Sequence, residues 1–184
     1  MPRIQPVNET NTPAASAPLL AGVKAQLGVV PAMMATWAHA PAALKAYTAM
    51  AGALASGELS AAERELIALA VAEANHCGYC LAAHHVLGRG AGLSEAGMAA
   101  ARDGRGTTAR EAALATLAQQ VVRQRGLISD AEFAAARSAL GEAAVLEVIA
   151  VVALNIYTNY TNHIAQTAVD FPEVALREPL KRVA

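Results

Sequence analysis

The chain is poor in aromatic residues and in cysteine. Among its 184 residues there are one Trp, two Phe and two Cys, although 55% of the residues are apolar. The apolar share therefore comes from alanine, with leucine and valine, and not from large rings. This composition favours helices that pack closely together.

The sequence lacks the features expected of a protein that binds nucleic acid or spans a membrane. The net charge is −1 and the basic residues form no cluster, which argues against nucleic acid as the main partner. The longest apolar run, near 143–156, is interrupted by Glu147 and Asn155, and we expect it to be too short to span a bilayer. The N-terminus lacks the apolar core of a signal peptide. We therefore expect a cytoplasmic protein with no membrane or nucleic-acid partner.

Helical patterns cover most of the chain, and no stretch alternates with period two over a strand's length. We predict an all-α fold, a compact domain of about eight helices over residues 18–184, after an extended or flexible N-terminal arm at residues 1–17. Three capping boxes mark helix starts, each with Ser or Thr three residues before Glu; they are Ser60/Glu63, Thr108/Glu111 and Ser129/Glu132. We expect the last helix to run from about Glu142 to Val169.

The reactive residues are concentrated in one stretch. Cys77 and Cys80 form a C-G-Y-C pair, and His84 and His85 follow directly. On a helix that begins near Cys77, His84 shares one face with both cysteines, whereas His85 is turned about 100° away. The positive end of the helix favours thiolate over thiol. We expect the glycines at 88, 90 and 92 to form the loop that follows this helix.

Glu65 joins this cluster only if the chain reverses. It lies twelve residues before Cys77, which is roughly 18 Å along a straight helix. Asn75 and His76 are poor helix formers and predict a bend there. In the resulting hairpin Glu65 is nearly level with His84, and its carboxylate can orient or charge the imidazole.

The pattern Glu65–x11–Cys77–x2–Cys80–x3–His84 resembles that of the alkylhydroperoxidase D-like branch of the carboxymuconolactone decarboxylase superfamily. The helical pattern on both sides is similar too, so the resemblance covers most of the chain. It implies an all-α homo-oligomer, often a trimer or hexamer. It also implies a thiol-dependent peroxidase or disulfide reductase without a cofactor, which takes a hydroperoxide substrate and an external thiol or disulfide reductant.

The resemblance also implies a role for each residue. Cys80 attacks the peroxide, Cys77 resolves the sulfenic acid, and His84 with Glu65 relays protons. The helix dipole alone favours Cys77 as the more acidic thiol, because Cys77 is nearer the helix start. The chain departs from the best-known form of the motif at Tyr79, where that form has a second histidine. Tyr79 or His76 is the candidate replacement.

Other readings of the cysteine pair stay open. A metal site would combine Cys77 and Cys80 with one or two histidines, although no second cysteine pair exists to complete a common structural zinc site; the histidines are His76, His84, His85 and His163. A decarboxylase or lactone-processing enzyme of the same superfamily would not need the cysteines. A redox sensor or zinc-binding protein without enzymatic activity is the third possibility.

Overall fold

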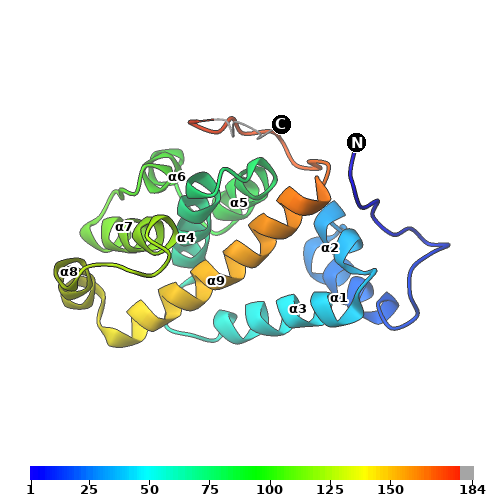
Figure 1. The fold of residues 1–184 in the computed structure, drawn as a ribbon, viewed down its shortest axis with the longest axis horizontal. Coiled ribbons are helices and arrows are strands. Elements are labelled where there is room, and N and C mark those ends of the chain that lie inside the picture. Colours follow the sequence, from blue (N-terminus) through cyan, green and yellow to red (C-terminus); the bar gives the residue numbers. More distant parts are fainter. Residues whose placement is uncertain (179–184) are drawn as a thin grey trace.

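The computed structural model describes residues 1–178, and this part of the chain holds nine α-helices and no strand (Figure 1). The prediction of an all-α fold is confirmed, with one helix more than the expected eight. The helices are α1 (Ala17–Leu27), α2 (Ala32–Trp37), α3 (Pro41–Ala55), α4 (Ala61–Ala74), α5 (Gly78–Gly90), α6 (Glu95–Arg102), α7 (Ala109–Arg123), α8 (Asp130–Leu140) and α9 (Glu142–Ala165).

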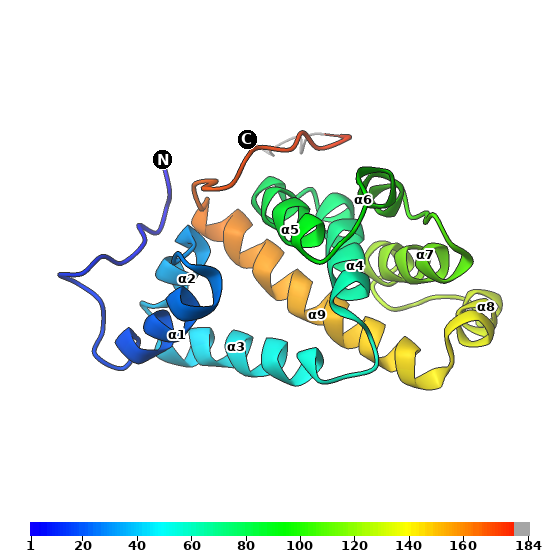
Figure 2. The ribbon, with the colours of Figure 1, turned by 180° about the vertical axis from the view of Figure 1, so that it is seen from behind.

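Helix α4 is the centre of the fold. It packs against α5, α6, α7 and α9, and every residue from Leu66 to Glu73 is buried. Its sequence is apolar nearly all round, as a helix surrounded by others requires. α9 crosses the molecule diagonally and contacts α4 and α3, which lie on different sides of it (Figures 1 and 2).

The helix starts agree with the sequence, whereas two ends differ. All three capping boxes are formed. The expected loop at glycines 88, 90 and 92 is correct only at Gly92, because α5 continues through Gly88 to Gly90. A side chain at Gly88 would come within 3.2 Å of Leu93 and Met98, so the close approach of the next segment explains this glycine. α9 ends at Ala165, four residues before the predicted Val169.

α9 has 24 residues and is long and apolar enough to cross a membrane by length and composition alone. The helix is therefore longer than the apolar run near 143–156 that was recognised in the sequence. It packs against five other helices. Its buried face contains three asparagines, Asn155, Asn159 and Asn162. These contacts and polar residues identify α9 as the core helix of a helical bundle.

The N-terminal segment passes close to the C-terminal end of α9, and the C-terminal segment leaves that end and runs across α5 toward α6 (Figures 1 and 2). In the N-terminal segment the backbone N–H of Arg3 donates to the carbonyl of Ala165 at 2.7 Å. In the C-terminal segment the N–H of Arg177 donates to the Glu73 carboxylate at 2.7 Å. Glu73 also forms a buried ion pair with Arg102, at 2.7 Å. These contacts hold the two segments over the junction of α4, α5 and α9.

Candidate active site

A tight reversal between α4 and α5 builds the site. The N–H of Cys77 donates to the carbonyl of Ala72 at 2.8 Å, and the N–H of His76 donates to that of Glu73 at 3.0 Å. This pair of bonds is the Schellman motif, whose turning residue is left-handed. His76 has that conformation, with φ of 54°. The bend predicted at Asn75–Cys77 is therefore present, and Cys77 becomes the N-cap of α5.

The two thiols lie together inside the protein. Both cysteines are free and buried, with their Sγ atoms 2.7 Å apart, and the Cys77 thiol donates toward Cys80. The backbone N–H of Cys80 donates to Sγ of Cys77 at 3.3 Å. Only a small movement is needed to join the sulfurs in a disulfide.

The hairpin brings Glu65 and His84 into contact, as the sequence predicted. Nδ1 of His84 lies 2.8 Å from Oε2 of Glu65. His85 points elsewhere, and its Nε2 lies 3.2 Å from a carboxylate oxygen of Glu95. The structure thus places all four predicted site residues, Glu65, Cys77, Cys80 and His84, in one cluster.

α9 adds polar groups that the sequence reasoning missed. Nδ2 of Asn162 donates to Sγ of Cys80 at 3.3 Å, and the Thr158 hydroxyl lies 3.8 Å from the same sulfur. A signal for these residues was present in the sequence. Polar residues at 155, 158, 159 and 162 recur at helical spacing within an otherwise apolar helix, and all four are buried.

These surroundings separate the pKa values of the two thiols. Burial raises the pKa of Cys80, but hydrogen bonding from Cys77, the charge of His84, and hydrogen bonds from Asn162 and Thr158 outweigh it and lower the pKa to about 7. Its hydrogen bond to Cys80, together with burial, raises the pKa of Cys77 well above the usual range. Burial lowers the pKa of His84, but the Glu65 carboxylate outweighs burial, and the net pKa is raised. The arrangement favours a thiolate on Cys80 beside an imidazolium on His84.

The comparisons with known proteins agree with this geometry. Residues 41–123 match the model of the carboxymuconolactone decarboxylase family. They include the α4–α5 hairpin and every residue of the predicted motif. This segment of the chain, a little under half of its length, is therefore similar to that family. No curated protein sequence matches it.

Solved structures share the alkylhydroperoxidase D-like fold over almost the whole chain. An alkylhydroperoxidase AhpD core, a peroxidase-related protein from Ralstonia eutropha JMP134, is 23% identical with a TM-score of 0.81, over 92% of both chains. A peroxidase-related protein from Silicibacter sp. TM1040 is 22% identical with a TM-score of 0.76, over 91% of this chain and 93% of that one. A cysteine-to-alanine variant of the debrominase Bmp8, in complex with 2,3,4-tribromopyrrole, is 17% identical with a TM-score of 0.77, over 91% of both chains.

Neither candidate replacement for the second relay histidine hydrogen-bonds a sulfur among the described residues. The hydroxyl of Tyr79 accepts the backbone N–H of Met33 at 3.2 Å, and its ring packs edge-on against Phe171. Nδ1 of His76 contacts the carbonyl of Glu178 at 2.7 Å. The polar partners of Cys80 come instead from α9. Residues 1–178 also contain no group of three or more His, Cys, Asp or Glu side chains placed to hold a metal ion.

An apolar cavity of about 680 Å³ opens onto Cys80 and His84. It lies between α1, α3 and α5, and most of its lining is aliphatic or aromatic. Met33, Tyr47, Tyr79, Thr158 and Phe171 line the cavity together with Cys80 and His84. A cavity of this size and polarity suits an organic molecule and presents it to the thiolate.

Proposed function

We propose that this protein is a dithiol oxidoreductase that reduces organic hydroperoxides. The observation that carries the proposal is the environment of Cys80. Its pKa is lowered to about 7, it faces an apolar cavity, and a second thiol lies 2.7 Å away. A thiolate of lowered pKa that lines a substrate-sized cavity, with a resolving cysteine beside it, is what reversible thiol oxidation requires.

The reaction starts with attack of the Cys80 thiolate on the terminal oxygen of a hydroperoxide, ROOH. The O–O bond breaks, an S–O bond forms, and Cys80 becomes a sulfenic acid. The leaving alkoxide takes a proton from the imidazolium of His84 and departs as the alcohol ROH. Glu65, 2.8 Å from the other side of the imidazole, stabilises the charged form that donates this proton.

Cys77 completes the oxidation. Its sulfur attacks the sulfenic sulfur of Cys80, the S–O bond breaks, and hydroxide leaves as water after taking the thiol proton. The product is a Cys77–Cys80 disulfide, and two electrons have passed from the dithiol to the peroxide. An external thiol reductant must supply two electrons to restore the dithiol.

Reductive dehalogenation is the second candidate, and it rests on the fold shared with the debrominase and on the apolar cavity. The same dithiol holds the two electrons that this reaction needs. An aryl bromide and two thiols would give the arene, bromide, a proton and the Cys77–Cys80 disulfide. The cavity, at about 680 Å³, has room for a halogenated ring beside Cys80.

One set of variants tests both candidates. Reduced wild type, Cys80→Ser and Cys77→Ser are mixed in turn with cumene hydroperoxide and with 2,3,4-tribromopyrrole, and loss of thiols and release of product are followed. We expect wild type to lose two thiols per molecule of hydroperoxide. Cys80→Ser should consume none, and Cys77→Ser should stop after one slow turnover with a sulfenic acid on Cys80.

The outcomes separate the proposals. Bromide release in place of peroxide consumption would replace the first candidate by the second. Wild-type turnover in Cys80→Ser would remove Cys80 as the attacking residue and refute both. Tight, stoichiometric zinc in the purified protein would instead support a metal-binding role for the cysteines.

We also propose that the protein is a cytoplasmic homo-oligomer, a trimer or hexamer. Large apolar side chains of α9 are exposed on the surface of the single chain, among them Leu146, Ile149, Tyr160 and Ile164. A set of this kind along one core helix is typical of a surface that another subunit covers. Light scattering of the purified protein measures the subunit number, and a monomer at micromolar concentration would contradict the proposal.

A further inference from the structure

A second cleft, of about 540 Å³, lies on the other side of the dithiol. It is lined by residues at the start of α5 and at the end of α9, together with Arg3 from the N-terminal segment and Leu176 from the C-terminal segment. Unlike the first cavity, it has a lining that is about half polar. The polar side chains are those of Arg3, His76, Asn162, His163, Gln166 and Thr167.

The two cavities divide the cysteines between them. Cys80 and His84 line the apolar cavity, whereas Cys77 lines the polar cleft. Tyr79 lines both and thus forms part of the wall between them. A molecule in the polar cleft therefore approaches the disulfide from the Cys77 end without entering the cavity at Cys80.

The cleft has buried polar atoms that await a partner. Oδ1 of Asn162 and Oγ1 of Thr167 are the buried side-chain atoms in the described part of the chain that lack a hydrogen bond. Both residues line the cleft, and the Asn162 side chain is 4% exposed. Buried polar groups are normally paired, so two unpaired ones at a single cleft indicate a bound molecule with hydrogen-bond donors.

Backbone strain is concentrated at the same place. Three residues other than glycine have positive φ in the described chain, and two of them, His76 and Gln166, line this cleft. Such conformations are retained where the surroundings or the function require them.

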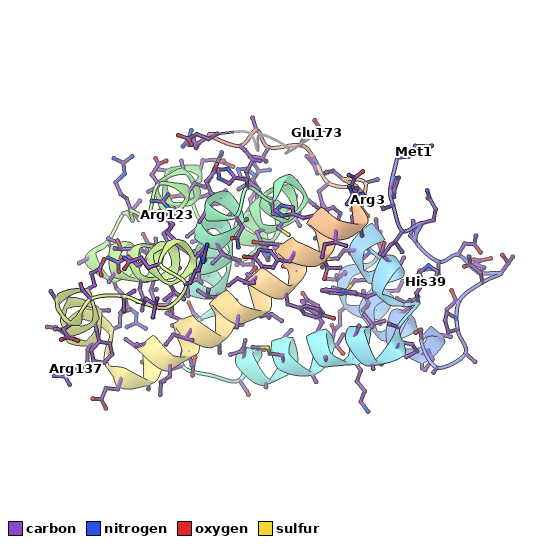
Figure 3. The ribbon with its side chains drawn as sticks, in the orientation of Figure 1. Met1, Arg3, His39, Arg123, Arg137 and Glu173 are labelled. Atoms are coloured by element: carbon purple, nitrogen blue, oxygen red, sulfur yellow. The ribbon has the colours of Figure 1, made fainter. Side chains whose placement is uncertain are left out.

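The charge of the cleft favours an anion. Arg3 supplies a cation at its edge, near the end of α9 (Figure 3). Gly78 and Tyr79 belong to the first turn of α5, so the positive end of that helix faces the cleft. No acidic side chain is present among the described residues that line it.

We propose that this cleft admits the reductant, a small anionic thiol that attacks Cys77; the inference rests on the proposed function. The thiolate of the reductant bonds to Sγ of Cys77, the Cys77–Cys80 bond breaks, and Cys80 leaves as a thiolate. A second reductant thiolate attacks the reductant sulfur of this mixed disulfide. The products are an oxidised reductant pair and the Cys77 thiolate, which takes a proton.

The two thiol environments support this direction of attack. In thiol–disulfide exchange the sulfur of lower pKa is the better leaving group. Cys80 is that sulfur, since Asn162, Thr158 and the charge of His84 still stabilise its thiolate when Cys77 is held in the mixed disulfide. Attack at Cys77 therefore places the leaving charge where the protein already holds it, and peroxide and reductant use separate entrances.

The test measures reduction alone. The disulfide is made with diamide, so that no peroxide turnover is needed, and the return of thiols after addition of 2-mercaptoethanesulfonate is followed by acid quench. Val169→Trp adds bulk at an exposed residue of the cleft, and Gly52→Leu adds bulk in the apolar cavity. We expect Val169→Trp to slow reduction by about tenfold or more, and Gly52→Leu to change it by less than about twofold.

Charge is tested with Arg3→Gln and two thiols, each rate being normalised to its thiolate concentration. Reduction by anionic 2-mercaptoethanesulfonate should slow by about fivefold, and reduction by neutral 2-mercaptoethanol should change little. Slowing by Gly52→Leu in place of Val169→Trp would overturn the proposal, and equal effects of Arg3→Gln on both thiols would overturn the anionic class. Absence of peroxide consumption with this pattern intact would refute the proposed function alone.

Discussion

The two cysteines are three residues apart, yet they occupy opposite environments. Cys80 faces an apolar cavity and receives hydrogen bonds from α9, and the charge of His84 stabilises its thiolate. Cys77 lies at the junction with a polar cleft, caps the start of α5, and donates its own proton toward Cys80. The difference between the two sides teaches that tertiary neighbours decide which sulfur becomes a thiolate.

The helix dipole alone predicted the opposite order. Cys77 is nearer the start of α5 and would be the more acidic thiol on that ground. The structure has the lower pKa at Cys80, because direct hydrogen bonds and a neighbouring cation outweigh a partial charge shared along a helix end. Which of the two cysteines attacks first stays a prediction, and the hydrogen bonds to Sγ of Cys80 favour the assignment implied by the family resemblance.

The largest loss of stability is expected when the buried ion pair between Arg102 and Glu73, behind the Cys77 turn, is broken. Arg102→Ala leaves the carboxylate of Glu73 without its cation in a buried place, where the two side chains are 10% and 7% exposed. We expect the free energy of unfolding to fall by about 3–5 kcal/mol. Arg105→Ala is the control, because its ion pair with Asp103 is exposed and should contribute less than about 1 kcal/mol. Urea denaturation measures both, and equal losses would contradict the burial argument.

On the Cys80 side, His84→Ala should raise the pKa of the Cys80 thiol, because it removes the cation that stabilises the thiolate. We expect about fivefold less thiolate at pH 7. The control is His85→Ala, which removes the neighbouring imidazole on the outer face, paired with Glu95. Thiolate absorbance near 240 nm against pH measures both variants. An unchanged titration in His84→Ala would remove His84 from the site.

The pH dependence of Cys80 alkylation in the unmodified protein tests the same thiol without a mutation. Since the pKa of Cys80 is lowered to about 7, alkylation by iodoacetamide should accelerate through pH 7 and level off above it. The sign for stability follows from linkage. Folding lowers the pKa of Cys80 from about 9 to about 7, so the Cys80 thiolate stabilises the folded protein fully above pH 9. This stabilisation is lost as the pH falls through about 7. A midpoint near the ordinary value would show that α9 and His84 do not activate the thiol.

The hairpin was predictable from sequence because its determinants are local. The three capping boxes are local signals, and so are the poor helix formers Asn75 and His76, and the four-residue spacing of Cys80 and His84. The contribution of α9 was not predicted, because Asn162 lies 82 residues from Cys80 and meets it only through packing. The same holds for both cavities, since each joins segments from distant parts of the chain.

A smaller effect is expected at the turn that carries Cys77. His76 has φ of 54°, which glycine adopts without penalty, whereas a side chain raises its energy. His76→Gly should therefore be more stable than His76→Ala by about 1 kcal/mol, since both variants lose the contact with Glu178 and only one is strained. The difference in thermal stability between the two variants measures the energetic cost of the positive φ at residue 76. Equal stabilities would show that the turn relaxes when the histidine is removed.

The smallest effects compare one glycine from each cavity. A Cβ at Gly52, inside α3, or at Gly78, at the first position of α5, would meet nothing within 4 Å. Gly52→Ala should raise the free energy of unfolding by about 0.5–1 kcal/mol, because alanine is the better residue in a helix interior. Gly78→Ala should raise the free energy of unfolding by only about a few tenths of a kcal/mol, because the first helical position constrains the backbone less. Urea midpoints measure both, and a loss of stability at Gly52 would show that α3 needs its glycine for a contact that another subunit makes.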